Sequence, residues 1–222
     1  MKVMVFGATG GSGRAAVEQL AASGHEVSAF TRRAAAALPG GVRNVQGDVM
    51  NMTDVERAVR GQEAIIVSLG ISENPLRVRL FGPAHTPPNV RSAGTRHIIA
   101  AMREHGVRRL VVQTSYGVGE TRHCLSVVDR LFFALLLKPQ IADTELQSAD
   151  VAASGLDWVL VQPVHLTNET HAAWPFLSTA GEVERRQVSR SSVGRFLAQA
   201  VASPHFLGKS VAVSGARAAS RA

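Results

Sequence analysis

Short apolar runs alternate with segments of helical periodicity along most of the chain. Uninterrupted runs of this kind are typical of strands that are buried on both faces of a parallel sheet. We predict strands over 3–6, 27–30, 42–46, 64–69, 110–113, 158–161 and 210–213. Apolar residues at helical spacing predict helices over 12–23, 54–60, 89–105, 126–138, 143–154 and 192–202. Ser191 or Ser192 is expected to cap the last of these helices.

A strand followed by a helix, repeated along the chain, predicts an α/β fold. We expect a single doubly wound parallel sheet of the Rossmann type, with helices on both faces. No change of composition marks a linker, so we expect one domain over 1–215 and a disordered tail over 216–222. In such sheets the ligand binds at the carboxyl ends of the strands. The least regular stretches of the chain are expected to form the pocket there: 70–88, 115–125 and 165–185. Within the last of them, we expect Trp174-Pro175 to form a wall on which the acceptor stacks.

A glycine-rich loop, GATGGSGR at 7–14, joins the first predicted strand to the first predicted helix. Gly7 permits a tight turn off the strand, and Gly13 lets the helix pack closely. Gly10 and Gly11 let backbone amides approach a phosphate, which the free N–H groups of the helix N-terminus also favour. This context predicts a dinucleotide-binding loop; the alternative is a tight turn without a ligand.

The second predicted strand ends in Thr31, Arg32 and Arg33. NAD-binding sites usually carry Asp or Glu there, which accepts hydrogen bonds from the ribose hydroxyls. A carboxylate would repel a 2′-phosphate, whereas a guanidinium can form paired hydrogen bonds with it. We therefore expect NADP(H) rather than NAD(H), with Arg14 in the first helical turn adding to the same positive site. The alternative is that these arginines only face solvent.

Two further strand ends carry candidate cofactor contacts. Asp48 follows the third strand, where its carboxylate would accept from the adenine amino group while Val49 packs on the ring. The alternative is that Asp48 caps the next helix. The fourth strand ends at Leu69-Gly70, where the glycine lets the backbone lie beside the cofactor.

Five stretches of the chain together resemble the atypical short-chain dehydrogenases/reductases. Within them, the chain is most similar to the small NAD(P)H-binding group that includes biliverdin-IXβ reductase. The stretches lie in order within 1–168: GATGGSGRAAVEQLAASGHEVSAFTR, GDV, AVRGQEAIIVSLG, NVRSAGTRHIIAAMREHGVRRLVVQTS and SGLDWVLVQPVHLT. The resemblance implies that the cofactor phosphates lie on Gly7, Thr9, Gly10 and Ser12. It also implies that the nicotinamide lies near Gln113, Thr114, Ser115, Pro163, His165 and Leu166.

The chain departs from the wider family at the catalytic pair. Most short-chain dehydrogenases use a Tyr that protonates the substrate, with a Lys four residues on that lowers the pKa of the phenol. Here Tyr116 is the only tyrosine, and residue 120 is Glu. Ser115 and His165 remain as candidate proton donors, each with a purely cofactor-binding role as the alternative. For Tyr116, also a candidate catalytic residue, we expect a role in lining the substrate site or in packing rather than in proton transfer.

Two functions follow. The first is an NADPH-dependent reductase that passes hydride to a small conjugated acceptor such as a flavin, a quinone or a carbonyl compound, with the cofactor carrying the hard chemistry. The second is a redox sensor that binds NADP(H) without turnover. The Ser115 and His165 pair favours the enzyme.

Bulk composition narrows the partners further. The net charge of +7 comes almost entirely from arginines, which are scattered, so we expect no nucleic-acid partner. The apolar run LFFALLL is too short to span a bilayer, and we expect no leader, because the N-terminus goes straight into a strand pattern. With one cysteine, Cys124, no internal disulfide is possible. We expect a cytoplasmic monomer or homodimer without a membrane partner. We also expect no metal, because His165, Glu169 and His171 lack a further ligand at a suitable spacing.

Overall fold

A mostly parallel β-sheet forms the centre of the protein. The computed structural model describes residues 1–33, 38–70, 86–124, 138–169 and 173–217. Within them the sheet has eight strands in the order β3-β2-β1-β4-β5-β6-β10-β8, and only β8 runs antiparallel to its neighbour. The strands are β1 (Lys2–Phe6), β2 (Glu26–Thr31), β3 (Arg43–Gln46), β4 (Ala64–Val67), β5 (Arg109–Gln113), β6 (Asp157–Pro163), β8 (Phe176–Ser178) and β10 (Lys209–Ser214).

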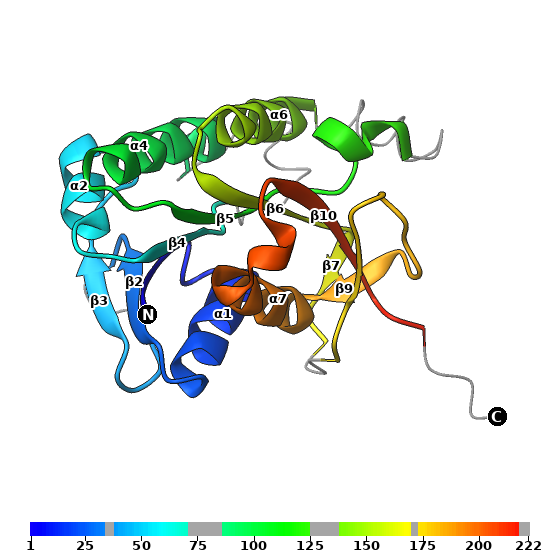
Figure 1. Cartoon of the computed structure of the whole chain (residues 1–222), viewed down its shortest axis with the longest axis horizontal. Helices are drawn as coiled ribbons and strands as arrows, with labels where there is room; N and C mark the ends of the chain where they lie inside the picture. The colour runs from blue at the N-terminus through cyan, green and yellow to red at the C-terminus, as the bar shows by residue number, and fades with distance from the viewer. Residues whose placement is uncertain (34–37, 71–85, 125–137, 170–172, 218–222) are drawn as a thin grey trace.

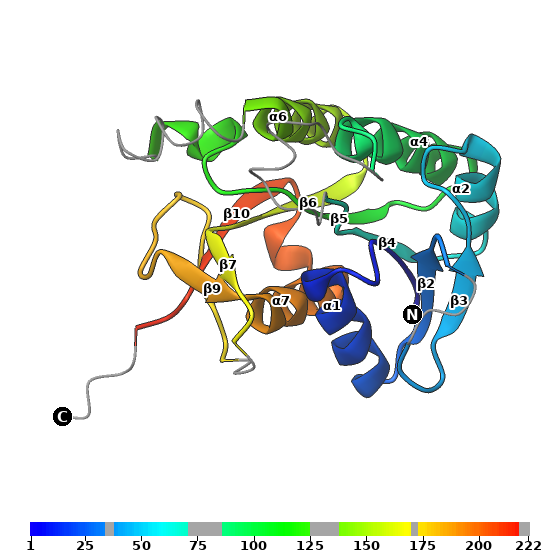
Figure 2. The same ribbon diagram turned by 180° about the vertical axis from the view of Figure 1, so that it is seen from behind.

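Helices cover both faces of this sheet, as Figures 1 and 2 show from opposite sides. On one face lie α1 (Gly11–Ala22) and α7 (Arg190–Ala202); on the other lie α2 (Met52–Val59), α4 (Val90–Glu104) and α6 (Lys138–Ala152). Residues of β1 alternate between the two cores. Val3 and Val5 belong to the core under α1 and α7, and Met4 and Phe6 belong to the other. Because both faces are buried, the strands read as continuous apolar runs, and the predicted doubly wound α/β fold is confirmed.

The largest difference from the predicted elements lies after β6. The stretch expected to be irregular contains β8 and a separate two-stranded parallel sheet of β7 (His165–Thr167) and β9 (Gln187–Ser189). These strands have three residues each, which is too short for a periodicity to appear in the sequence. The described residues also include the short 3₁₀ helices η1 (Gly119–Cys124) and η3 (Pro204–Phe206).

Some predictions fall on other parts of the chain. Of the helix expected over 126–138, all but the last residue lies outside the described residues, as do most of the loop at 70–88 and the end of the tail. The helix expected over 143–154 begins earlier, at Lys138. No helix among the described residues combines the length and the apolar character that crossing a membrane requires.

Helices α1 and α7 pack unusually closely against each other. A Cβ atom on Gly194 of α7 would lie 2.4 Å from the Cβ of Ala15 and 2.7 Å from the backbone nitrogen of Ala16. The first residues of the two helices also meet, because the side chain of Arg190 lies against Gly11. This contact brings the N-terminus of α7 to the glycine-rich loop, at the carboxyl end of β1.

We expect Gly194→Ala to destabilise the protein by about 2 kcal/mol, because the added methyl group overpacks the contact between α1 and α7. Urea unfolding followed by circular dichroism measures the change. Gly40→Ala is the matched control, since a Cβ there meets nothing within 4 Å and the residue does not have a positive φ. It should change the free energy of unfolding by less than about 0.5 kcal/mol. Equal stability of both variants would contradict the close packing.

Candidate functional site

The glycine-rich loop forms a tight turn between β1 and α1. Gly7 has a φ of +82°, and a Cβ there would lie 2.3 Å from the carbonyl oxygen of Ser68. A Cβ on Gly13 would lie 2.2 Å from the carbonyl oxygen of Gly7. The backbone N–H of Gly10 donates to the same Gly7 carbonyl at 3.0 Å. Both predicted reasons for glycine, the turn at Gly7 and the close approach of the helix at Gly13, are therefore confirmed.

The N-terminus of α1 is open to an anion. Gly10 is its N-cap, no side chain caps the helix, and its first turn contains no acidic residue. The first N–H groups of a helix carry a partial positive charge and need an acceptor. Thr9 is exposed beside them, and Ser12 is buried. An uncapped helix N-terminus behind a glycine turn fits a phosphate group.

Arg14, which we expected to add to the 2′-phosphate site, is engaged along α1. Its Nε lies 3.0 Å from Oε1 of Glu18 one turn later, and both side chains are about half exposed. This is an ordinary surface ion pair of neighbouring helical turns. The role of Arg14 toward the cofactor stays a prediction.

The structure shows a residue that the sequence did not single out. Arg190 lies over Gly11, and a Cβ on Gly11 would come within 2.3 Å of the Cδ of Arg190. We expected the missing side chain at residue 11 to admit a phosphate; the arginine fills that space. The expected caps at Ser191 or Ser192 were wrong, because Ser189 caps α7 by accepting from the N–H of Ser192 at 3.0 Å. Arg190 is consequently the first residue of α7.

The turn after β2 displays Arg32 and Arg33, and both are exposed. The hydroxyl of Thr31 and the amide of Asn44 both donate to the Arg33 carbonyl, at 2.6 Å and 3.1 Å. These two bonds fix the backbone on which Arg32 sits. The turn therefore presents guanidinium groups where an NAD-specific site would carry a carboxylate.

The predicted adenine contacts also gather at one place. Val49 is buried, and a Cβ on Gly94 of α4 would lie 2.8 Å from Val49 and 3.1 Å from Leu69. Asp48 is exposed and accepts from the N–H of Met50 at 2.9 Å. Its alternative role as a helix cap is wrong, because Asn51 caps α2. The sequence analysis did not single out Gly94. A glycine inside a helical pattern was the signal that could have pointed to a close contact there.

Arg91 lies beside Gly70, where β4 leads out of the sheet. A Cβ on Gly70 would be 3.0 Å from Nη2 of Arg91. The buried carboxylate of Asp143 accepts from the N–H groups of Arg91 and Ser92, at 3.0 Å and 3.1 Å. Burial lowers the pKa of Arg91, and the charge of Asp143 opposes that shift. Gly70 therefore adjoins a partly desolvated cation that the sequence analysis also missed.

The end of β5 carries three polar residues. The hydroxyl of Ser68 donates to the amide oxygen of Gln113 at 3.0 Å, which joins the ends of β4 and β5. Thr114 is 2% exposed, and its hydroxyl has no hydrogen-bond partner among the described residues. Ser115 is half-buried. Buried hydroxyl groups are normally paired, so the lone Thr114 hydroxyl fits a ligand with a polar group at this edge.

The backbone places Ser115 and His165 in neighbouring segments. The N–H of Tyr116 donates to the carbonyl of Pro163 at 3.0 Å, and His165 begins β7 two residues later, exposed. The Tyr116 hydroxyl donates to the carbonyl of Gly181 at 2.9 Å. The predicted pocket stretches 115–125 and 165–185 are thereby brought together. Leu166 is half-buried against the core under α7.

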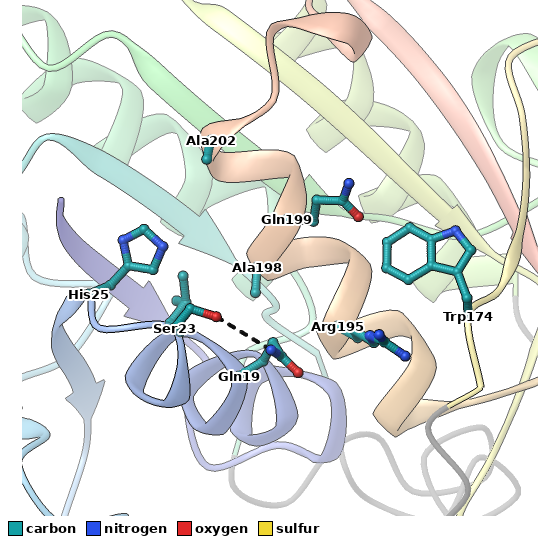
Figure 3. Close-up of a pocket in the computed structure, with 9 residues that line it drawn as sticks. Gln19, Ser23, His25, Trp174, Arg195, Ala198, Gln199 and Ala202 are labelled. Atoms are coloured by element: carbon teal, nitrogen blue, oxygen red, sulfur yellow. Dashed lines mark hydrogen bonds between the residues drawn. The ribbon is translucent and has the colours of Figure 1, made fainter.

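Trp174 occupies a different place from the one that we expected. It lines a groove of about 280 Å³ between α1 and α7 (Figure 3), together with Gln19, Leu20, Ser23, His25, Arg195, Ala198, Gln199 and Ala202. The guanidinium carbon of Arg195 lies 5.3 Å from the centre of the indole ring. The ring of Phe196 meets the indole edge-on, with a centroid distance of 6.3 Å. Trp174 packs on α7, so the structure gives no support to its role as a wall of the acceptor pocket.

The glycine turn, the open helix N-terminus and the cationic end of β2 together define a Rossmann-type dinucleotide-binding protein. Comparison with known proteins identifies the family. The chain belongs to the NAD(P)H-binding family, whose model matches residues 7–204. The family that the sequence resemblance predicted is thereby confirmed at this level.

Solved structures share the fold over nearly the whole chain. The anaerobilin reductase ChuY of Escherichia coli O157:H7 is 21% identical with a TM-score of 0.79, covering 99% of this chain and 100% of its own. A short-chain dehydrogenase/reductase of Veillonella parvula in complex with NADP is 17% identical with a TM-score of 0.77, covering 96% and 94%. The oxidoreductase ylbE of Lactococcus lactis is 18% identical with a TM-score of 0.77, covering 99% and 93%. At these identities the likeness concerns the fold.

Proposed function

We propose that this protein is an NADPH-dependent reductase that passes hydride to a small conjugated acceptor, such as a flavin, a quinone or a carbonyl compound. The observation that carries the proposal is the exposed Arg32 after β2, the strand that pairs with β1, together with the uncapped N-terminus of the helix that follows β1. Two structural neighbours, an anaerobilin reductase and a short-chain dehydrogenase/reductase in complex with NADP, support it.

The residues around the carboxyl edge fit this cofactor. The turn at Gly7 and the N-terminus of α1 would hold the phosphates, and Arg32 the 2′-phosphate. Asp48 and Val49 would hold the adenine. The unpaired hydroxyl of Thr114 supports a polar ligand group at the end of β5, where the nicotinamide is expected. When bound, NADPH supplies the hydride.

The chain's own residues would orient the acceptor and supply the proton that it takes up. Ser115 is half-buried, and His165 is exposed on the neighbouring segment, so a proton held on the imidazole would be exchangeable with solvent. The Tyr116 hydroxyl donates to Gly181, so its proton already has an acceptor. We therefore propose Ser115 and His165 as the groups that contact the acceptor, and Tyr116 as the residue that holds the 181 turn against η1.

One observation favours the alternative, a redox sensor that binds NADP(H) without turnover. The lone tyrosine lacks a lysine four residues on and is hydrogen-bonded to the backbone. Without that pair, any acid assistance to the acceptor would have to come from Ser115, His165 or solvent. A sensor would bind NADPH tightly and would not catalyse its oxidation by any of the acceptors.

We expect the purified protein to oxidise NADPH in the presence of at least one of FMN, quinones and biliverdin, as measured by the absorbance of the reduced nicotinamide. Ser115→Ala should lower kcat by about 10- to 100-fold, because a positioned hydroxyl near the reacting atoms is lost. Ser23→Ala, at an exposed serine that directly follows α1, is the matched control and should keep the wild-type kcat. Tight NADPH binding without turnover of any acceptor would favour the sensor.

A further inference from the structure

The position of Arg190 has no explanation in the stability of α7. It is the first residue of the helix, where the partial positive charge of the N-terminus opposes a cation. The first turn of α7 contains no acidic residue, and no carboxylate forms an ion pair with Arg190 within the described parts of the chain. A guanidinium placed against two helix N-termini is favourable when an anion lies between them.

The side chain of Arg190 is nonetheless held in place. Its Nη1 donates to Oδ1 of Asn168 at 2.7 Å and lies 3.4 Å from the carbonyl oxygen of Leu166. Its aliphatic part lies on the backbone of Gly11, where a Cβ would be 3.4 Å from Cγ, 2.3 Å from Cδ and 3.1 Å from Nε. No described group accepts from Nε or Nη2, so these donors of the planar fork are unused.

We infer that Arg190 binds the pyrophosphate of the dinucleotide, through the donors that its contact with Asn168 leaves unused. This inference rests on the proposed NADPH-binding function. The N–H groups of α1 receive the phosphates at one side, and the guanidinium next to Gly11 supplies the compensating charge at the other. Glycine at residue 11 serves this arrangement, because any Cβ would displace the arginine.

Arg190 also links the phosphate site to the nicotinamide end of the site. Asn168 and Leu166 belong to the segment that carries His165, and Leu166 pairs with Val188 in the sheet of β7 and β9. A pyrophosphate that draws the guanidinium toward α1 therefore acts on the same segment that presents His165. Arg190 is in this respect a positioning residue as well as a ligand.

Binding of two ligands to Arg190→Gln tests the inference. NADPH contains the pyrophosphate, whereas adenosine 2′-monophosphate contains the adenosine and the 2′-phosphate only. We expect the Kd for NADPH to rise about 10- to 50-fold, because charge-assisted hydrogen bonds are lost, and the Kd for adenosine 2′-monophosphate to change less than about twofold. In Arg190→Lys the Kd for NADPH should rise about fivefold, since a lysine lacks the planar fork of donors. Isothermal titration calorimetry measures each constant.

Arg195→Gln is the matched control, with the same loss of charge on the same helix at the Trp174 contact. It should leave both constants unchanged. Equal weakening of both ligands by Arg190→Gln, or no weakening of NADPH, would overturn the inference alone. A wild-type protein that binds no NADPH would instead overturn the proposed function and the inference together. Thermal unfolding of each variant separates a loss of binding from a loss of folding.

A double-mutant cycle tests the pairing of Gly11 with Arg190. Gly11→Ala should weaken NADPH binding about tenfold in the wild-type background, because its Cβ meets the Cδ of Arg190. In the Arg190→Gln background the same change should have an effect below about threefold. Equal effects in both backgrounds would show that the Cβ at residue 11 hinders the cofactor directly and not through Arg190, and the proposed pairing would be wrong.

Discussion

Arg32→Asp is expected to reverse the nucleotide preference of this protein. The Kd for NADPH should rise by about 100-fold or more, because a paired interaction with the 2′-phosphate is replaced by repulsion between like charges. The Kd for NADH should fall several-fold, since a carboxylate at the end of β2 accepts from the free ribose hydroxyls. The bonds from Thr31 and Asn44 to the Arg33 carbonyl keep the backbone in place, so the substitution changes the chemistry of the turn and not its shape.

Fluorescence titration with NADPH and NADH measures this reversal. Arg60→Asp is the control for charge, because it changes the net charge by the same amount at the exposed end of α2. It should alter neither constant by more than about twofold at physiological ionic strength, where distant surface charges are screened. An unchanged NADPH affinity in Arg32→Asp would mean that the arginines after β2 only face solvent.

Gly13→Ala is expected to have the largest effect on both folding and cofactor binding. Alanine is favoured over glycine in a helix by about 1 kcal/mol, which alone would stabilise α1. The new Cβ, however, would lie 2.2 Å from the backbone carbonyl oxygen of Gly7, where no side-chain movement relieves the contact. The helix must move away from the loop. We expect a net loss of about 3 kcal/mol in the free energy of unfolding and no measurable NADPH binding.

Gly24→Ala provides the matched control for this prediction. Gly24 follows α1, has a φ of +78°, and a Cβ there would meet nothing within 4 Å. The substitution should cost about 1 kcal/mol through backbone strain and leave the Kd for NADPH unchanged. Urea unfolding and calorimetry on the same preparations distinguish the two variants. A Gly13→Ala protein that binds NADPH normally would contradict the proposed role of the glycine-rich loop in holding the phosphates.

Most of the main sheet and several of its helices were predictable, because their signals are local. The apolar runs of β1, β4 and β5 mark strands buried on both faces, and each appears within one or two residues of its predicted bounds. The strands β7, β8 and β9 were missed because their pairing partners are distant in the chain and each has only three residues. The start of α6 and the cap of α7 were displaced for a similar reason, since helix ends depend on their neighbours.

By itself the sequence determined the class of fold, the glycine turn and the arginines after β2, because strand periodicity and turn chemistry act between residues close in the chain. The sequence alone also shows that no lysine stands four residues after Tyr116. Only the tertiary structure decided that Arg190 lies on Gly11, that Gly94 meets Val49 and Leu69, and that Trp174 packs on α7. These contacts join residues that are apart in the sequence, and they depend on the packing of α7 against α1 and of α4 against the sheet.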